Sequence, residues 1–226
     1  MNTRPAILVL TIGSLCGLLG VLVLPRLPLD QTDQLRTIAA QGPHFLAGTA
    51  LSFGSAAILM VGFGRLAGYF GRLKLRVPAA LAATAAFGWF LHTALITLNS
   101  VTYELARQPD PAEMAVVAAA LYAGPVFLGL LIPMLLATLI GMIGTAVSLW
   151  RTHLAPLWLL PVVVLALVSD FVAPEEFSGV PMFVLLAVGF GALWWRAGVT
   201  ATGRDSRRTR VQGPAGPASD TPAGGL

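Results

Sequence analysis

The feature that most constrains this chain is a series of apolar stretches, each long enough to cross a bilayer as a helix. A helix needs about 20 mostly apolar residues to span the roughly 30 Å hydrocarbon core. Transmembrane β-strands would alternate apolar and polar residues, and stretches such as 157–168 do not alternate. The sequence therefore predicts an all-α bundle of six transmembrane spans. The first two spans run from 6 to 24 and from 44 to 64. The third begins near residue 78, and the fourth ends near residue 150. The fifth and sixth run from 156 to 172 and from 181 to 195.

The composition excludes an ordinary cytosolic enzyme. Hydrophobic residues make up 56% of the 226 residues and charged residues only 11%, whereas soluble domains carry about 25% charged residues. The single cysteine excludes an internal disulfide framework and a thiolate zinc cluster. The first apolar stretch is longer than the roughly 7–15 residues of a signal-peptide core, and no small-residue cleavage site follows it. We therefore interpret it as a retained membrane anchor.

The basic residues predict which side of the membrane each loop faces. Lysine and arginine accumulate on cytoplasmic loops, and here they are concentrated at both termini and in every second loop. Both termini are therefore predicted in the cytoplasm, and the protein in the inner or plasma membrane of the cell. The net charge of +4 then reflects arginines beside anionic lipids rather than nucleic-acid binding. The basic residues assigned to the cytoplasmic side are Arg4, Arg65, Arg72, Lys74, Arg76, Arg151, Arg196, Arg204, Arg207, Arg208 and Arg210.

Two predicted helices are longer than the membrane is thick. Residues 78–107 and 111–150 would form helices of about 45 Å and about 60 Å. Asp110 is placed to cap the second of them, and Pro125 and Pro133 should kink it. We interpret 111–150 as one kinked span rather than two, because another crossing would reverse the charge pattern downstream. Helices three and four of the bundle are thus predicted to extend on the outer side.

Two further segments are assigned outside the spans. Residues 30–41 are predicted to form a short surface helix capped by Asp30. From Thr200 onward the chain is rich in Gly, Pro, Ala, Ser, Thr and Arg and lacks an apolar face, which is typical of disorder. We therefore divide the chain into a transmembrane helix bundle, residues 1–199, and a disordered cytoplasmic tail, residues 200–226.

A polar stripe in the outer half of the third span is the candidate site. Its members lie four, three and four residues apart, so they share one face of the helix, and His92 lies beside that face. The inner half of the same helix is almost entirely apolar, which indicates an outward-facing cavity lined by the stripe. The alternative, that the outer turns simply leave the membrane, explains His92 less well. The stripe consists of Thr93, Thr97, Ser100 and Glu104.

His92 and Asp170 are ionisable residues placed within predicted spans. Each follows the proline that begins its span by about 14 residues, which puts both at about the same depth. Ionisable groups inside a membrane are costly unless paired or hydrated, and they tend to be functional. We therefore hypothesise a His92–Asp170 pair. The alternative, which we favour, is that Asp170 begins an outer loop ending at Glu175 and Glu176, with His92 a neutral interhelical donor.

His44 begins the second span from the outer side and is a further candidate for lining the cavity. A metal site would have to combine it with His92, Asp170 and Glu104, but none of these pairs has the helical spacing that metal ligands use. The motifs of phosphate-binding loops, serine hydrolases and zinc proteases are absent from the sequence. We therefore predict no catalytic, metal-binding or cofactor-binding residues.

Three classes of function follow from this architecture. The first is transport or binding of a small molecule or ion through the outward-facing cavity. The second is a non-catalytic scaffold or accessory subunit of a larger membrane complex, in which small-residue stripes such as 13–17 and 137–145 pack helices or a partner. An intramembrane enzyme ranks last, because no nucleophile accompanies His92 and Asp170. The expected partner is the lipid bilayer and, for the scaffold class, another membrane protein as well. The sequence leaves the oligomeric state open.

The composition also carries a resemblance. The chain is biased toward Ala, Gly, Leu, Val and Arg and contains one lysine, Lys74. In this bias and in the layout of its spans it resembles multi-pass integral membrane proteins of high-GC actinobacteria. The resemblance implies a location in the inner membrane and no catalytic residue.

Overall fold

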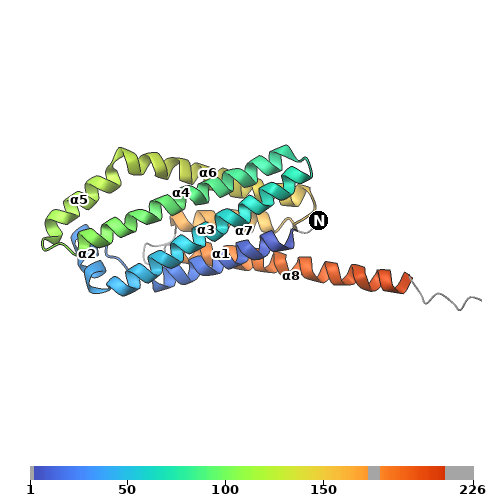
Figure 1. The fold of residues 1–226 in the computed structure, drawn as a ribbon, viewed down its shortest axis with the longest axis horizontal. Helices are drawn as coiled ribbons and strands as arrows, with labels where there is room; N and C mark the ends of the chain where they lie inside the picture. The colour runs from blue at the N-terminus through green and yellow to red at the C-terminus, as the bar shows by residue number, and fades with distance from the viewer. Residues whose placement is uncertain (1–2, 173–178, 212–226) are drawn as a thin grey trace, which may run out of the picture.

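The structure is a computed structural model that describes residues 3–172 and 179–211. It consists of eight helices over those residues, with no strand among them, which confirms the predicted all-α fold (Figure 1). The helices are α1 (Arg4–Val23), α2 (Gln31–Ala40), α3 (Gly42–Arg72), α4 (Arg76–Ala106), α5 (Pro111–Ala123), α6 (Pro125–Arg151), α7 (Leu159–Val172) and α8 (Val180–Val211).

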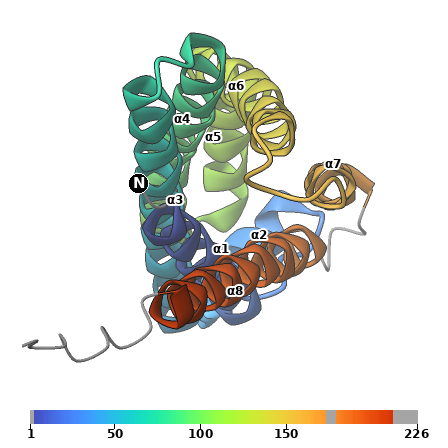
Figure 2. The same cartoon turned by 90° about the vertical axis from the view of Figure 1, so that its right-hand side faces the viewer.

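Six of the helices form a ring. Each contacts two neighbours, in the order α1, α3, α4, α6, α7, α8 and back to α1 (Figure 2). The smallest contact in the ring is the one between α6 and α7. Side chains such as Leu10 and Phe63 are buried inside, whereas Leu19, Leu165 and Val188 are exposed on the outside. A bundle that is apolar on both its inner and outer faces is suited to a lipid environment.

Five helices are long and apolar enough to cross a membrane: α1, α3, α4, α6 and the first part of α8. The fifth predicted span corresponds to α7, which has 14 residues. At 1.5 Å per residue α7 is about 21 Å long, shorter than the roughly 30 Å hydrocarbon core. Over the described residues, the structure thus supports a membrane protein with five spanning-length helices and two shorter apolar helices, α5 and α7.

Small residues hold neighbouring helices at short distances, as the stripes in the sequence predict. Between α1 and α3 the Ser55 hydroxyl donates a hydrogen bond to the Gly13 carbonyl at 2.7 Å. Between α4 and α6, the backbone of Ala85 lies where a side chain on Gly141 would project. Such contacts bring two backbones together, and packing of this kind is a main source of helix association in lipid.

The fourth predicted span is divided in two, so the prediction of a single kinked helix for 111–150 is wrong. α5 ends at Ala123 and α6 begins at Pro125, with the intervening Gly124 extended at φ −70° and ψ 155°. Proline disfavours helical backbone in the residue before it, which is why the break falls here. Pro133, the other predicted kink, remains inside α6. The predicted extension of the fourth span is therefore a separate helix, α5.

The end of the molecule away from the N-terminus carries a small second core (Figure 1). Asp30 caps α2 by accepting a hydrogen bond from the Asp33 amide at 2.9 Å, as predicted. Asp110 caps α5 in the same way, accepting from the amides of Ala112 and Glu113. Side chains of α2, α3, α4 and α5 meet in this core. They are Leu35, Ile38, Phe45, Ala106 and Ala115.

Two predicted boundaries differ from the observed helix ends. α3 continues past Gly64 to Arg72, because Leu66, Tyr69 and Phe70 maintain the helical spacing of buried residues. α8 continues to Val211, beyond residue 200, where the tail was predicted to begin. Residues 212–226 lie outside the described residues, so disorder of the tail stays a prediction.

Candidate functional site

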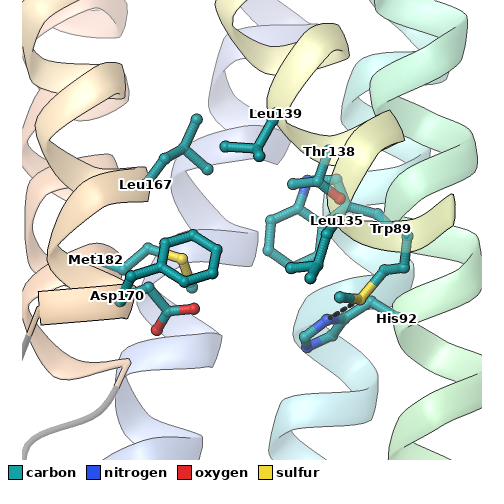
Figure 3. Close-up of a pocket in the computed structure, with 10 residues that line it drawn as sticks. Trp89, His92, Leu135, Thr138, Leu139, Leu167, Asp170 and Met182 are labelled. Carbon is teal, nitrogen blue, oxygen red and sulfur yellow. Dashed lines mark hydrogen bonds between the residues drawn. The ribbon is translucent and has the colours of Figure 1, made fainter. Parts of the chain in front are cut away.

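A small pocket lies between α4, α6, α7 and α8 (Figure 3). Its volume is about 50 Å³, and apolar side chains form most of its wall. Since one water-sized group occupies roughly 10–15 Å³ by this measure, the pocket has room for a few atoms. The residues that line it are Trp89, His92, Met134, Leu135, Thr138, Leu139, Leu167, Asp170, Phe171 and Met182.

His92 and Asp170 both line this pocket, so the structure brings together two residues that lie far apart in the sequence. Figure 3 shows them on opposite walls, toward the same end of the pocket, with Leu139 and Leu167 toward the other end. Both side chains are partly buried. Among the described residues no hydrogen bond or ion pair joins the two, so the hypothesised direct pair is not seen, although both face one cavity.

His92 contacts a methionine rather than a carboxylate. Its Nδ1 lies 3.0 Å from Sδ of Met134, which comes from α6. A thioether sulfur accepts hydrogen bonds weakly and does not donate them, so this contact places the imidazole proton on Nδ1. The other ring nitrogen, Nε2, then carries the lone pair. The Trp89 ring packs against the imidazole with centroids 5.2 Å apart.

Asp170 is held at the end of α7 by a backbone contact. The amide of Gly179, the residue before α8, donates a hydrogen bond to the carboxylate. Gly179 has φ +79°, a left-handed conformation that glycine adopts without strain. The start of α8 thus positions the acidic group of the pocket. Glu175 and Glu176, to which the alternative assigned an outer loop, lie outside the described residues.

The polar stripe of α4 does not line the pocket. The hydroxyls of Thr93 and Thr97 donate to carbonyls of their own helix, those of Phe90 at 2.6 Å and Ala94 at 2.5 Å. Thr93 is buried against the bundle, whereas Thr97, Ser100 and Glu104 are exposed. Because successive residues in a helix are about 100° apart, the face that carries His92 meets the pocket and the stripe turns away from it.

The exposed end of the stripe and His44 are also separate from the pocket. Glu104 pairs with Arg107 at 3.5 Å, with both side chains more than half exposed. His44 is exposed on the first turn of α3. Within the described part of the chain, no group of three His, Cys, Asp or Glu residues is arranged to hold a metal ion.

Several lining residues were missed by sequence reasoning. Met134 and Met182 are apolar residues within apolar segments, and nothing in the sequence indicates that they line a cavity. Trp89 did carry a signal, because it lies one helical turn before His92, away from the ends of the spans where the other tryptophans cluster. Its indole N–H is buried without a hydrogen-bond partner among the described residues.

The crossing of α4 and α6 fixes one corner of the pocket. Gly88 lies against Thr138, so that a side chain at position 88 would overlap the Thr138 hydroxyl. This close approach places Trp89 and His92 beside Met134 and Thr138. The pocket walls are therefore set by backbone packing rather than by flexible loops.

Comparisons of the chain with protein-family models, with curated proteins and with solved structures find no match.

Proposed function

We propose that this chain is a six-span protein of the cell membrane, with both termini in the cytoplasm, that binds a small molecule or ion in an outward-facing pocket as part of transport. The observation that carries the proposal is that His92 and Asp170 line opposite walls of one pocket in an apolar bundle. Ionisable residues at membrane depth face cavities and mark substrate or ion pathways in membrane proteins.

The position of the pocket supports its outward orientation. Asp170 lies two residues before the end of α7, and Met134 lies in the first half of α6. These parts of the bundle face the end that carries α2 and α5 (Figure 1). At the opposite end the Arg4 guanidinium lies 5.0 Å from the Trp194 ring, and the basic residues Arg72 and Arg151 occupy helix ends there. The positive-inside rule assigns that end to the cytoplasm.

The size of the pocket limits the size of the ligand that it can hold. A volume of about 50 Å³ holds an ion or a molecule of a few heavy atoms. Drug-sized ligands need pockets of about 300–1,000 Å³, so a ligand of that size does not fit. The carboxylate of Asp170 favours a cation or a hydrogen-bond donor.

We expect the substitution Asp170→Asn to weaken ligand binding by at least about tenfold, because a hydrogen bond to a charged group contributes about 1.5–3 kcal/mol. The reporter is Trp89 fluorescence in purified protein whose other tryptophans, Trp150, Trp158, Trp194 and Trp195, are replaced by phenylalanine. The probes are the chlorides of sodium, potassium, ammonium and methylammonium, and silver nitrate in chloride-free buffer.

The matched control is Glu104→Gln, which removes a carboxylate of α4 that lies outside the pocket. The proposal predicts a saturable response to at least one probe, kept in Glu104→Gln and weakened in Asp170→Asn. Equal affinities in the two variants, or no saturable response to any probe, would contradict a binding function at this pocket.

An alternative function, a scaffold or accessory subunit without a ligand, is supported by exposed apolar side chains on α5 and at the start of α6. Val116 is 70% exposed and Val126, just after the α5–α6 break, is 75% exposed. Both lie in the outer part of the molecule, where a membrane-protein partner has access to them. The same titration separates the two functions, because a scaffold predicts no saturable response that depends on Asp170.

A further inference from the structure

We infer that the pocket is a site for a soft monovalent metal ion of the copper(I) class, held by the Met134 sulfur, the His92 imidazole and the Met182 sulfur, with Asp170 supplying the countercharge. The inference rests on the proposed function and names its ligand. It begins from the contact between Nδ1 of His92 and Sδ of Met134, which are 3.0 Å apart.

The two atoms in this contact are better metal ligands than hydrogen-bond partners. A thioether is a weak hydrogen-bond acceptor, yet thioether sulfur and imidazole nitrogen are both ligands for soft metals. In a tetrahedral site with bonds of about 2.1 Å and 2.3 Å, nitrogen and sulfur ligands lie about 3.6 Å apart. A metal ion therefore requires this contact to open by about 0.6 Å, which the flexible methionine side chain permits.

A second sulfur comes from the facing wall. Met182, in the first turn of α8, is buried and lines the same pocket. Figure 3 shows it beside Asp170, opposite His92. These two thioethers and the imidazole are the soft ligands of the proposed site, and they come from three different helices.

The charges and the size agree with such an ion. A monovalent cation beside the ionised Asp170 carboxylate leaves the pocket neutral overall, which lowers the energy of both charges at membrane depth. The imidazole stays neutral by moving its proton from Nδ1 to Nε2. A single ion also fits the volume of about 50 Å³.

The same pocket is unsuited to hard cations. Calcium takes six to eight oxygen ligands, and magnesium demands an octahedron of oxygens. Here the described lining offers one carboxylate and one hydroxyl, those of Asp170 and Thr138. The donor set therefore selects against calcium and magnesium.

The test uses silver(I), which resembles copper(I) in ligand preference and is stable in air. The full-length chain is purified with Trp89 as its one tryptophan and with Cys16→Ser, because the Cys16 thiol would itself bind silver. The imidazole of His92 lies 5.2 Å from the Trp89 ring between centroids, so silver bound there should quench the fluorescence. Bound silver is counted independently by elemental analysis after gel filtration.

We expect one silver ion per chain, with affinity lowered at least tenfold in Met134→Leu and in Met182→Leu. The matched control is Met142→Leu, which changes a methionine of the same helix as Met134 that is buried in the core but does not line the pocket. Leucine conserves the volume of methionine, so the variants should fold, and their thermal unfolding is measured alongside.

Silver affinity that is the same in Met134→Leu, Met182→Leu and Met142→Leu would overturn the inference, as would absence of bound silver. If silver does not bind but ammonium or another probe gives a response that depends on Asp170, the metal assignment is wrong and the proposed binding function stands. If no probe gives a saturable response, both fail.

Discussion

Replacing Gly141 by alanine is expected to lower the free energy of unfolding by about 3 kcal/mol, the upper part of the range for overpacking. The added Cβ would overlap the backbone nitrogen of Ala85 and lie 2.5 Å from its Cα. Backbone atoms have no rotamer by which to move away, so α4 and α6 must separate. The measurement is unfolding of the purified protein in mixed micelles by titration with a denaturing detergent.

The matched control is Gly129→Ala on the same helix. No atom lies within 4 Å of a Cβ built at Gly129, and alanine in a helix interior is more stable than glycine by about 0.5–1 kcal/mol. Gly129→Ala should therefore be neutral or stabilising. If the two variants unfold alike, α4 and α6 do not cross at Gly141.

Separation of α4 and α6 should also change the shape of the pocket. Gly141 lies one helical turn from Thr138, where Gly88 makes its own close contact. A shift of this crossing moves Trp89 and His92 relative to Met134, so we expect Gly141→Ala to weaken any response of Trp89 to ligands. Gly129→Ala should leave that response unchanged.

The second large effect is expected for Phe63→Ala, which should lower the free energy of unfolding by about 3–5 kcal/mol. Phe63 is 1% exposed inside the ring, and its ring meets that of Phe190 edge-on at 6.3 Å. Alanine leaves a cavity between α3 and α8 that neighbouring helices cannot fill without moving. The same detergent titration measures the effect.

Phe53→Ala provides the comparison, because Phe53 lies on the same helix and is 44% exposed on the outside of the bundle. In lipid an outward side chain has similar surroundings in the folded and the unfolded state, so its truncation should change stability by less than about 1 kcal/mol. Equal losses for the two variants would contradict the assignment of which face of α3 is inside.

The apolar stretches predicted the helices well because the constraint behind them is strong. Lipid offers no hydrogen-bond partners for the backbone, so a long apolar segment has to become a helix. The starts of α2 and α5 were also predicted from the sequence. Asp30 and Asp110 accept hydrogen bonds from backbone amides in the first turn of these helices. These are local interactions, which depend only on neighbouring residues.

The predicted helix ends that differ from the observed ones are set by tertiary contacts or by the backbone conformation of a single residue. Gly64 and Arg65 suggested an end to the second span, but burial of Leu66 and Phe70 against other helices continues α3 to Arg72. At Gly124 a single extended residue separates α5 from α6. Proline marked this position, but a kink and a complete break have the same sequence signal.

The candidate site was predicted in part. His92 and Asp170 were chosen for their depth, and the two residues line one pocket. The stripe from Thr93 to Glu104 was chosen for its spacing, yet spacing defines a shared face without showing where the face points. The methionines that complete the pocket were not predictable, because their role depends on how α6 and α8 are rotated in the ring.

The central claim, six crossings with both termini in the cytoplasm, is tested most directly by thiol labelling in intact cells. In a Cys16→Ser background, the variants Ala39→Cys, in α2, and Ser219→Cys, near the C-terminus, are treated with a membrane-impermeant thiol reagent. We predict that Ala39→Cys is labelled from the medium and that Ser219→Cys is labelled only after permeabilisation. Labelling of both variants in intact cells would mean an even number of crossings between α2 and the C-terminus, as expected if α7 did not span, which would contradict the six-span arrangement and the outward-facing pocket.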